Sequence, residues 1–396
     1  MIYSKIIYEY SKIEDADLKQ FIINTPQLHK YFKLDWNILK SRQYCGILNF
    51  EGEDYYLLPK ISNKNEKTNL DTFIYMLMCA YDIKLQNEDI ASCENQTHTI
   101  LEVFIQMFAK KLFQELQFGI FKEYITEQEN LTTLRGKYLI NENLKYNHIK
   151  NKIYCEYDEF SMNNELNQFF LFAIKSLLPF AKDKRILMQC EIALDEVEVK
   201  SFDINGLNIH FHRLNNRFKE SFEFAILLLQ KSIPLFSKDK KSFAFLFDMN
   251  ELFEKFIGRM ILSLDPKTKL QNKKNFGNLQ LKPDIITSNM IIDTKYKILR
   301  SKEDLAVSDK YQMFVYGTNF ELKNTMLLYP KHLEHFDYEL HLGKGEKEIG
   351  LKIRSIDLEC AVRDSEEVPL GHGSCGYGEF LDEMKNRIEG VLNGEN

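Results

Sequence analysis

The sequence predicts a multidomain α+β protein, with a β-rich N-terminal region, a connecting arm of helices and some strands, and a C-terminal mixed sheet flanked by helices. Two observations support this. Apolar residues recur with a period of two in some stretches and 3.6 in others, which indicates both strands and amphipathic helices. The chain has 396 residues, 44% of them apolar and 28% charged, which is enough for several folded cores. We expect domains at 1–160, 161–240 and 241–396.

The N-terminal region begins with strand-like sequence. Residues 2–10 mix β-branched and aromatic side chains, and 45–58 reads as a hairpin that turns at Glu51–Asp54 and is closed by Pro59. Part of 15–39 is expected to be helical.

From Leu70 onward the predicted elements are mainly helices. We expect helices over 72–80, 97–127, 165–181 and 216–236, and strands over 137–140, 153–157, 197–202 and 207–214. His210 and His212 share a strand face, but without a third ligand nearby they do not indicate a metal site.

The C-terminal region reads as helix, hairpin, helix and strand, an order that gives a mixed sheet with one helical crossover. The expected elements are a helix over 248–261, a hairpin over 284–296, a helix over 308–318, strands over 324–330 and 348–359, and a terminal helix over 379–392. Residues 371–376 match G-x-G-x-x-G, but no strand leads into them, so we expect a loop.

Composition limits the function classes. The formal net charge is −6, which argues against a general nucleic-acid coat but allows a local basic surface. Residues 267–282 contain five lysines and no acidic residue. The lysines are Lys267, Lys269, Lys273, Lys274 and Lys282. This run is either a phosphate-binding surface or a solvated loop.

Cysteine spacing and hydropathy indicate a cytoplasmic protein. The seven cysteines form no C-x-x-C pair, so reduced thiols are expected. The first residues do not resemble a signal peptide, and no apolar run reaches the roughly 18 residues that a membrane helix requires.

The hairpin over 284–296 carries the strongest chemical signal. If Ser288 and Asn289 form a two-residue loop, Asp284 lies opposite Asp293, at a Cβ separation of about 4.5–5.5 Å. Like charges in that relation are destabilising and call for a cation. Lys295 projects from the same strand face as Asp293.

Two carboxylates and an ammonium are the groups that metal-assisted phosphodiester hydrolysis needs. Mg²⁺ suits such a site because it takes few protein ligands. We expect Asp284, Asp293 and the main-chain carbonyl of Thr294 to be ligands, and Lys295 to hold the attacking water or face the phosphate. A solvated hairpin with charged ends is the alternative.

Two neighbouring helices add further candidates. Glu254 lies among apolar residues of its helix and is expected to face the site more than Glu251 does, where it could bind a second ion or the first through water. Gln312 and Tyr316 share one helix face at i and i+4 and would support the site.

The motif resembles that of the PD-(D/E)xK nuclease superfamily: Pro283-Asp284, eight residues, then Asp293-Thr294-Lys295. Further segments resemble the McrC family, the nuclease subunits of McrBC modification-dependent restriction systems. These segments are 45–48 with 58–61, 134–136, 155–161, 247–254, 282–297 and 309–316. The stretch beyond Val362 has no counterpart that we can place.

The resemblance implies a restriction-endonuclease-like C-terminal domain that cuts double-stranded DNA with Mg²⁺. It also implies an McrB-like AAA+ GTPase ring as partner, which binds the GTP and on which 1–160 docks, with 161–240 as the connecting arm. The sequence itself contains no G-x-x-x-x-G-K-[ST] phosphate loop. Pairing of two nuclease domains, the number of metal ions and the DNA or methylation specificity are left open.

Two alternatives to this interpretation differ in mechanism. The chain could be a stand-alone repair or recombination nuclease of the same fold, active without a nucleotide-hydrolysing partner. It could also be a non-enzymatic stimulator of a AAA+ GTPase.

Overall fold

The computed structural model describes residues 5–61, 66–83, 100–147, 151–204, 206–237, 240–299, 301–331, 335–359 and 376–394. The chain forms two compact units: unit 1 combines Met1–Glu94 with Leu246–Asn396, and unit 2 is Asn95–Phe245. The predicted multidomain α+β class is confirmed. The functional division of the chain at 160 and 240 stays a prediction.

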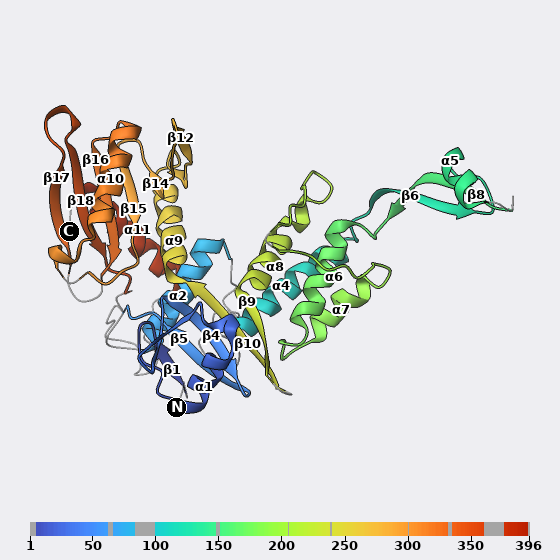
Figure 1. Cartoon of the computed structure of the whole chain (residues 1–396), viewed down its shortest axis with the longest axis horizontal. Coiled ribbons are helices and arrows are strands. Elements are labelled where there is room, and N and C mark those ends of the chain that lie inside the picture. The colour runs from blue at the N-terminus through green and yellow to red at the C-terminus, as the bar shows by residue number, and fades with distance from the viewer. Residues whose placement is uncertain are drawn as a thin grey trace. The chain divides into compact units, whose positions relative to one another are not determined.

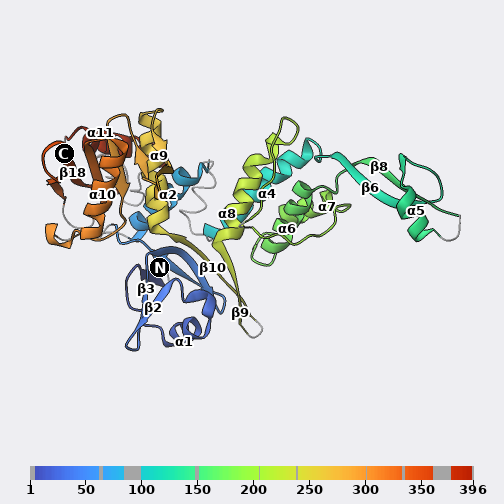
Figure 2. The ribbon, with the colours of Figure 1, turned by 45° about the horizontal axis from the view of Figure 1, so that its top comes forward.

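Unit 2 contains a bundle of four helices, α4 (Ile100–Gln117), α6 (Glu165–Leu177), α7 (Arg185–Ala193) and α8 (Lys219–Lys231). Both views show a narrow β extension leading away from the helices (Figures 1 and 2). The extension consists of β6 (Glu123–Leu131), β7 (Lys137–Tyr138), α5 (Ile140–Tyr146) and β8 (Ile153–Ser161), with the sheet order β6-β8-β7.

The sequence-based expectations for unit 2 were partly wrong. The helix expected over 97–127 ends at Gln117, because Gly119 takes a φ of 114° and the chain then enters β6; residues 97–99 lie outside the described part. The strands expected over 197–202 and 207–214 are not formed, and helix α7 was not predicted. The expected helix over 216–236 becomes the short η2 (Asn216–Phe218), α8 and β9 (Ser232–Ser237).

The N-terminal part of unit 1 is a sheet in the order β1-β5-β4, extended by β10 (Lys240–Asp248), the strand through which the chain passes between the units. Its strands are β1 (Ile6–Tyr8), β4 (Tyr44–Phe50) and β5 (Glu53–Leu58). The predicted β4–β5 hairpin is confirmed, but its loop is only Glu51–Gly52, both at positive φ, as in tight hairpin turns.

The helix expected within 15–39 is confirmed only as α1 (Ala16–Asn24), followed by a short turn η1 (Pro26–Leu28). Asp15 caps α1 by accepting hydrogen bonds from two backbone amides. The remainder forms a second hairpin, β2 (Phe32–Asp35) and β3 (Ile38–Ser41), because Trp36 and Asn37 adopt the positive φ of a tight turn.

Three helices of unit 1 pack through aromatic side chains: α2 (Glu66–Tyr81), α9 (Met249–Leu264) and α11 (Tyr377–Asn393). The Phe380 ring of α11 lies 5.4 Å from Tyr75 and 5.8 Å from Phe256, measured between ring centroids. Asp248 caps α9 by accepting from the Asn250 amide. Residues 371–375, expected as a loop, lie outside the described part.

The C-terminal sheet has the order β11-β14-β15-β16-β18-β17. Its strands are β11 (Lys269–Leu270), β14 (Ile285–Ile286), β15 (Met290–Thr294), β16 (Asn324–Pro330), β17 (Asp337–Leu342) and β18 (Ile349–Ile356). Helix α10 (Val307–Phe320) connects the parallel strands β15 and β16, as the sequence predicted, whereas β17 was not predicted. A separate hairpin, β12 (Lys274–Phe276) with β13 (Leu279–Leu281), precedes β14.

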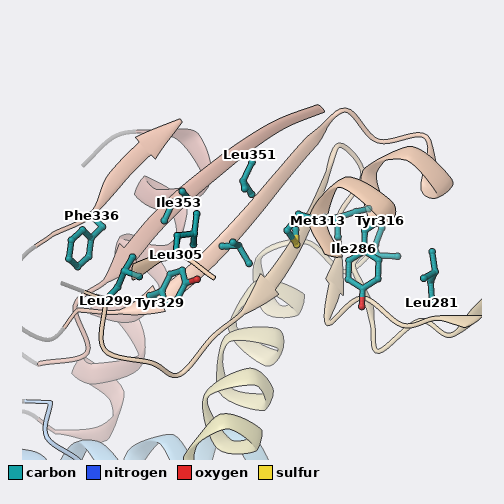
Figure 3. Close-up of a cluster of buried hydrophobic side chains, with 12 residues drawn as sticks. Leu281, Ile286, Leu299, Leu305, Met313, Tyr316, Tyr329, Phe336, Leu351 and Ile353 are labelled. Atoms are coloured by element: carbon teal, nitrogen blue, oxygen red, sulfur yellow. The ribbon is translucent and has the colours of Figure 1, made fainter. Parts of the chain in front are cut away.

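The core between α10 and this sheet is apolar (Figure 3). Met313 and Tyr316 of α10 belong to one buried cluster with Ile291 of β15, Leu327 of β16 and Leu351 of β18. The cluster also contains Tyr329 of β16 and Ile353 of β18, each two residues along from Leu327 or Leu351. Residues two apart on a strand share a face, so α10 covers one face of the sheet. At the other end of the sheet, Arg354 of β18 forms ion pairs with Asp337 and Glu339 of the edge strand β17.

The N-terminal sheet of unit 1 also contacts the end of β15. The Tyr296 hydroxyl donates to Glu9 Oε1 at 2.8 Å, and the Lys60 amide donates to the same oxygen at 2.9 Å. Both Glu9 and Tyr296 are buried, at 4% and 2% exposure. A single buried carboxyl therefore joins two segments that are nearly 300 residues apart.

The cluster under α10 is open to a direct stability test. Met313→Ala removes a fully buried side chain and should lower the free energy of unfolding of unit 1 by about 2–5 kcal/mol, as cavity-forming substitutions do. Tyr311→Ala on the same helix, where the side chain is 68% exposed, should change it by less than about 0.5 kcal/mol. Urea unfolding of both variants measures the difference, and equal effects would contradict the packing described.

Glu9 makes stability depend on pH. Burial raises the pKa of Glu9 from 4.5 to about 7, although the Lys60 amide and the Tyr296 hydroxyl oppose the shift. The folded protein therefore keeps a proton that the unfolded chain loses, so this contribution to stability is lost as pH rises from 4.5 through 7. Glu9→Gln should lose less stability than the wild type over that interval in urea titrations. Parallel stability curves for the two proteins would rule this out.

Candidate functional site

The site lies at the end of β15, an interior strand of the C-terminal sheet. The Thr287 amide donates to the Met290 carbonyl at 2.9 Å, and Ile285 and Ile286 pair with Ile292 and Ile291. The loop is therefore Ser288–Asn289, and the predicted register, with Asp284 opposite Asp293, is confirmed.

Asp293 is a buried acid whose charge is balanced by Lys295, which directly follows the end of β15. Asp293 is 1% exposed, and all five residues of its strand are buried. Lys295 lies two residues further along on the same strand face, and its Nζ is 2.5 Å from Asp293 Oδ2. Among the residues that the structure describes, Oδ2 has no further hydrogen-bond partner, so the ion pair is its stabilising interaction.

Gln312 of α10 connects the two members of the ion pair. Its Oε1 accepts from Lys295 Nζ at 3.2 Å, and its Nε2 donates to Asp293 Oδ1 at 3.3 Å. An ammonium only donates and a carboxylate only accepts, so the orientation of the Gln312 amide is set by chemistry. Gln312 can thus hold Lys295 and Asp293 in one fixed arrangement.

Tyr316 completes this contact one helical turn further along α10. Gln312 Nε2 also donates to the Tyr316 hydroxyl at 2.9 Å, and that hydroxyl donates to the Lys282 carbonyl at 3.2 Å. The predicted placement of Gln312 and Tyr316 on one helix face beside the acids is therefore found in the structure. The bond to Lys282 also fixes the segment that leads into Asp284.

Asp284 is held from the other side of the hairpin. Its Oδ2 accepts from the Thr294 amide at 2.9 Å and from the Thr294 hydroxyl at 3.1 Å. Two donors therefore stabilise this carboxylate, while Lys295 stabilises Asp293. The ammonium of Lys295 lies beside Asp293, and the cation expected between the two acids stays a prediction.

The two acids still influence each other. Burial raises the pKa of Asp293, and the negative charge of Asp284 raises it further. Burial by itself lowers the pKa of Lys295, but the charge and hydrogen bond of Asp293 outweigh it, so the pKa of Lys295 is raised. Lys295 therefore keeps its positive charge in the site.

Glu254 of α9 is the third carboxylate near this point. Burial raises its pKa to about 7, the charges of Asp284 and Asp293 add to the shift, and the ammonium of Lys282 opposes it. Glu251 pairs instead with the exposed Lys255 at 2.8 Å. The expectation that Glu254 faces the site more than Glu251 agrees with the effect of Asp284 and Asp293 on the pKa of Glu254 and with the pairing of Glu251 to Lys255.

The structure adds residues that the sequence reasoning did not single out. Thr294 was expected to contribute its carbonyl, whereas its amide and hydroxyl hold Asp284. Asp309 of α10 is buried, pairs with Lys297 at 3.3 Å and adds to the rise in the pKa of Asp293. The sequence signal for Asp309 was its position at the start of the 309–316 segment, which resembles the McrC family.

The site residues do not form a ready-made metal cluster. Over the described residues, no three or more acidic, histidine or cysteine side chains are gathered so that they could hold an ion. The four cysteines that the structure describes, 45, 79, 155 and 190, are free thiols.

Three comparisons place this architecture among known proteins. The model of the family described as McrBC 5-methylcytosine restriction system component matches residues 39–330, a span that contains every site residue predicted above. No curated protein matches the chain. No helix within the described ranges has the length and apolar character needed to cross a membrane.

Two solved structures are similar. A chain in the refined half-complex from a tetradecameric assembly of Thermococcus gammatolerans McrB AAA+ hexamers with bound McrC is 22% identical, with a TM-score of 0.57 over 96% of this chain and 99% of that one. A chain in the cryo-EM structure of the Thermococcus gammatolerans McrBC complex is 26% identical, with a TM-score of 0.47 over 65% and 87%. The first of these shows a shared fold.

The family match covers more than half of the chain and includes both the N-terminal hairpin and the site at the end of β15. The chain belongs to the family of McrBC 5-methylcytosine restriction system components.

Proposed function

We propose that this chain is a magnesium-dependent DNA endonuclease subunit that works with a GTP-hydrolysing AAA+ partner. The observation that supports it most is the buried contact of Asp293, Lys295 and Gln312, with Asp284 and Glu254 close enough to act on the same charges. Family membership supports a role in a restriction system.

The donors of the site suit a hard divalent cation. Asp284, Asp293 and Glu254 offer oxygen atoms only, and the Asp293 oxygen that faces Lys295 has no other partner within the described ranges. Asp284 and Asp293 with the Thr294 carbonyl would hold Mg²⁺, and Glu254 would reach it through water. The ion would supply Lewis acidity and lower the pKa of water.

The protein's own groups would position the reactants. Hydrolysis forms a bond from a water oxygen to phosphorus and breaks the bond from phosphorus to the leaving sugar oxygen. Lys295 keeps its charge and is held by Asp293 and Gln312, so its ammonium can orient the water or neutralise a phosphate oxygen. Glu254 has a pKa of about 7 and can take up a proton from water near neutral pH.

The lysines ahead of β14 support DNA as the substrate. Lys267, Lys269, Lys273, Lys274 and Lys282 are all exposed, and none is in an ion pair with an acid of the described residues. Phe276 anchors the β12–β13 hairpin by packing against Phe320 of α10, with 5.1 Å between ring centroids. Lys282 acts on the charge of Glu254, and exposed lysines in the stretch that leads to Asp284 fit a phosphate backbone.

The partner is inferred from the family and from the similar structure. That structure contains McrB AAA+ hexamers with bound McrC, so we propose an equivalent ring for this chain. GTP would bind to that partner, and residues 1–160 would dock on it. Separate tests are needed for the nuclease and for the partner.

Substitutions in the ion pair test the nuclease. In the full chain with its AAA+ partner, DNA, GTP and Mg²⁺, Asp293→Asn and Lys295→Ala should each slow DNA cleavage by about 100-fold or more, the scale of removing one group that stabilises the transition state. GTP hydrolysis should stay unchanged, and chelating Mg²⁺ with EDTA should stop cleavage. Lys255→Ala, which removes an exposed lysine on α9, is the charge-matched control.

Three results would redirect the proposal. Wild-type cleavage by both ion-pair variants would show that this site is not the nuclease. Cleavage by the purified chain alone would favour a stand-alone nuclease. Partner stimulation without any cleavage by the wild type would favour a non-enzymatic stimulator.

The lysine surface is tested through salt dependence. The double variant Lys273→Gln, Lys274→Gln should weaken DNA binding, and the slope of log affinity against log salt should fall by about 1 for each phosphate that the variant no longer neutralises. The control is Lys344→Gln, Lys347→Gln, which removes the same charge from the turn before β18, away from β14 in the strand order. Equal slopes for the two double variants in fluorescence anisotropy would exclude this surface.

A further inference from the structure

The hydrogen bond between Tyr296 and Glu9 lies directly beside the proposed catalytic lysine. Tyr296 follows Lys295 in the chain, and its hydroxyl reaches across to the segment after β1, 287 positions away in sequence. The Tyr296 ring also packs against Phe253 of α9, the neighbour of Glu254, at 5.9 Å between centroids. Tyr296 thus touches both helix α9 and the N-terminal sheet.

The backbone of Lys295 is held in a tight turn centred on Tyr296. The Lys295 amide donates to the Leu328 carbonyl of β16 at 2.9 Å, and the Lys297 amide donates back to the Lys295 carbonyl at 3.0 Å. In such a three-residue turn, the direction of the central side chain depends on the backbone conformation of the residues on both sides. The place of the Tyr296 ring therefore constrains where the Lys295 side chain starts.

Burying the Glu9 carboxyl beside Tyr296 costs free energy that simple packing of the tyrosine would not require. Its backbone amide bonds to the Leu58 carbonyl at 3.0 Å, and its Oε1 accepts from both Lys60 and Tyr296. Its Oε2 is buried and has no hydrogen-bond partner among the described residues. A buried polar atom without a partner costs free energy, which an apolar side chain at position 9 would avoid.

We propose that Glu9 is a positioning residue for the cleavage site: by accepting from the Tyr296 hydroxyl, it fixes the turn from which Lys295 reaches Asp293 and Gln312. This inference rests on the proposed function only in that Lys295 serves cleavage. The N-terminal sheet would then contribute to the cleavage site, because a displacement of Glu9 would shift Tyr296 and, with it, the neighbouring Lys295.

The placement of Lys295 can be measured without DNA or partner. In the wild type, contact with buried Asp293 should protect the Lys295 amine from an amine-reactive label such as acetic anhydride, read out by mass spectrometry. Tyr296→Phe and Glu9→Leu should raise the labelling rate of Lys295 severalfold, while the rate at exposed Lys255 stays the same. Glu9→Gln, which keeps an accepting oxygen, should retain the protection.

Cleavage should follow the same order. With partner, GTP and Mg²⁺ at saturating DNA, Tyr296→Phe and Glu9→Leu should slow single-turnover cleavage by about 10- to 100-fold, as small misplacements of catalytic groups do. The DNA concentration for half-maximal rate and the GTP hydrolysis rate should not change. Glu9→Gln should cleave at close to the wild-type rate.

A matched control separates positioning from stability. Tyr55 of β5 donates to Asp15 Oδ2 at 2.8 Å and accepts from Lys5 Nζ at 2.8 Å. Tyr55→Phe therefore removes a tyrosine-to-carboxyl bond of the same length, together with the Lys5 bond, and neither bond reaches β15. It should lower the thermal unfolding temperature but leave both the labelling of Lys295 and the cleavage rate unchanged.

The outcomes distinguish this inference from the proposed function. Wild-type labelling and cleavage in Tyr296→Phe and Glu9→Leu, with Lys295→Ala inactive, would overturn the positioning role and leave the nuclease assignment intact. Altered labelling with Lys295→Ala fully active would uphold the positioning of Lys295 and overturn its role in cleavage. An equal loss of cleavage in Tyr55→Phe would reduce the effect to stability and overturn the inference.

Discussion

The buried ion pair between Asp293 and Lys295 is the interaction on which the C-terminal sheet and its site depend. An acid at 1% exposure in an interior strand is tolerated only with a charged or hydrogen-bonding partner. The strand supplies that partner two residues later on the same face, at 2.5 Å. Removing either member leaves the other charge buried and unpaired, so the pair constrains every element that packs around it.

The elements around the pair each contribute one constraint. Helix α10 covers the sheet face with apolar side chains such as Met313, and turns Gln312 toward both charges. The hairpin register brings Asp284 opposite Asp293, where Thr294 donates to it twice. Helix α9 adds Glu254 with a pKa near 7. The same packing that stabilises the fold therefore brings Asp284, Asp293 and Glu254 near enough for their charges to act on one another, with the Lys295 ammonium beside Asp293. Among the described residues these acids do not form a metal cluster, and the shared charges are the basis for proposing phosphodiester cleavage here.

Local sequence patterns were enough to predict which candidate residues lie together at the end of β15. Contacts between segments far apart in the sequence could not be predicted. The Ser288–Asn289 turn and alternation along β15 were enough for the register, because a two-residue loop determines cross-strand partners. The helix expected up to residue 127 was wrong beyond Gln117, because an apolar stripe continues past Gly119 although the backbone there leaves the helix. The contact of Glu9 with Tyr296 could not be predicted, since nothing near either residue indicates the other. Thr294 was assigned a carbonyl role because its donors matter only once Asp284 is placed.

The central claim is that Asp284 and Asp293 bind one divalent ion beside Lys295. The most direct measurement is anomalous diffraction from crystals of the full chain soaked in Mn²⁺, which substitutes for Mg²⁺ and scatters anomalously. In the wild type we expect a peak that contacts both Asp284 and Asp293, and we expect it to disappear in Asp293→Asn. A peak bound elsewhere, or no peak while the two carboxylates keep their contacts to Thr294 and Lys295, would contradict it.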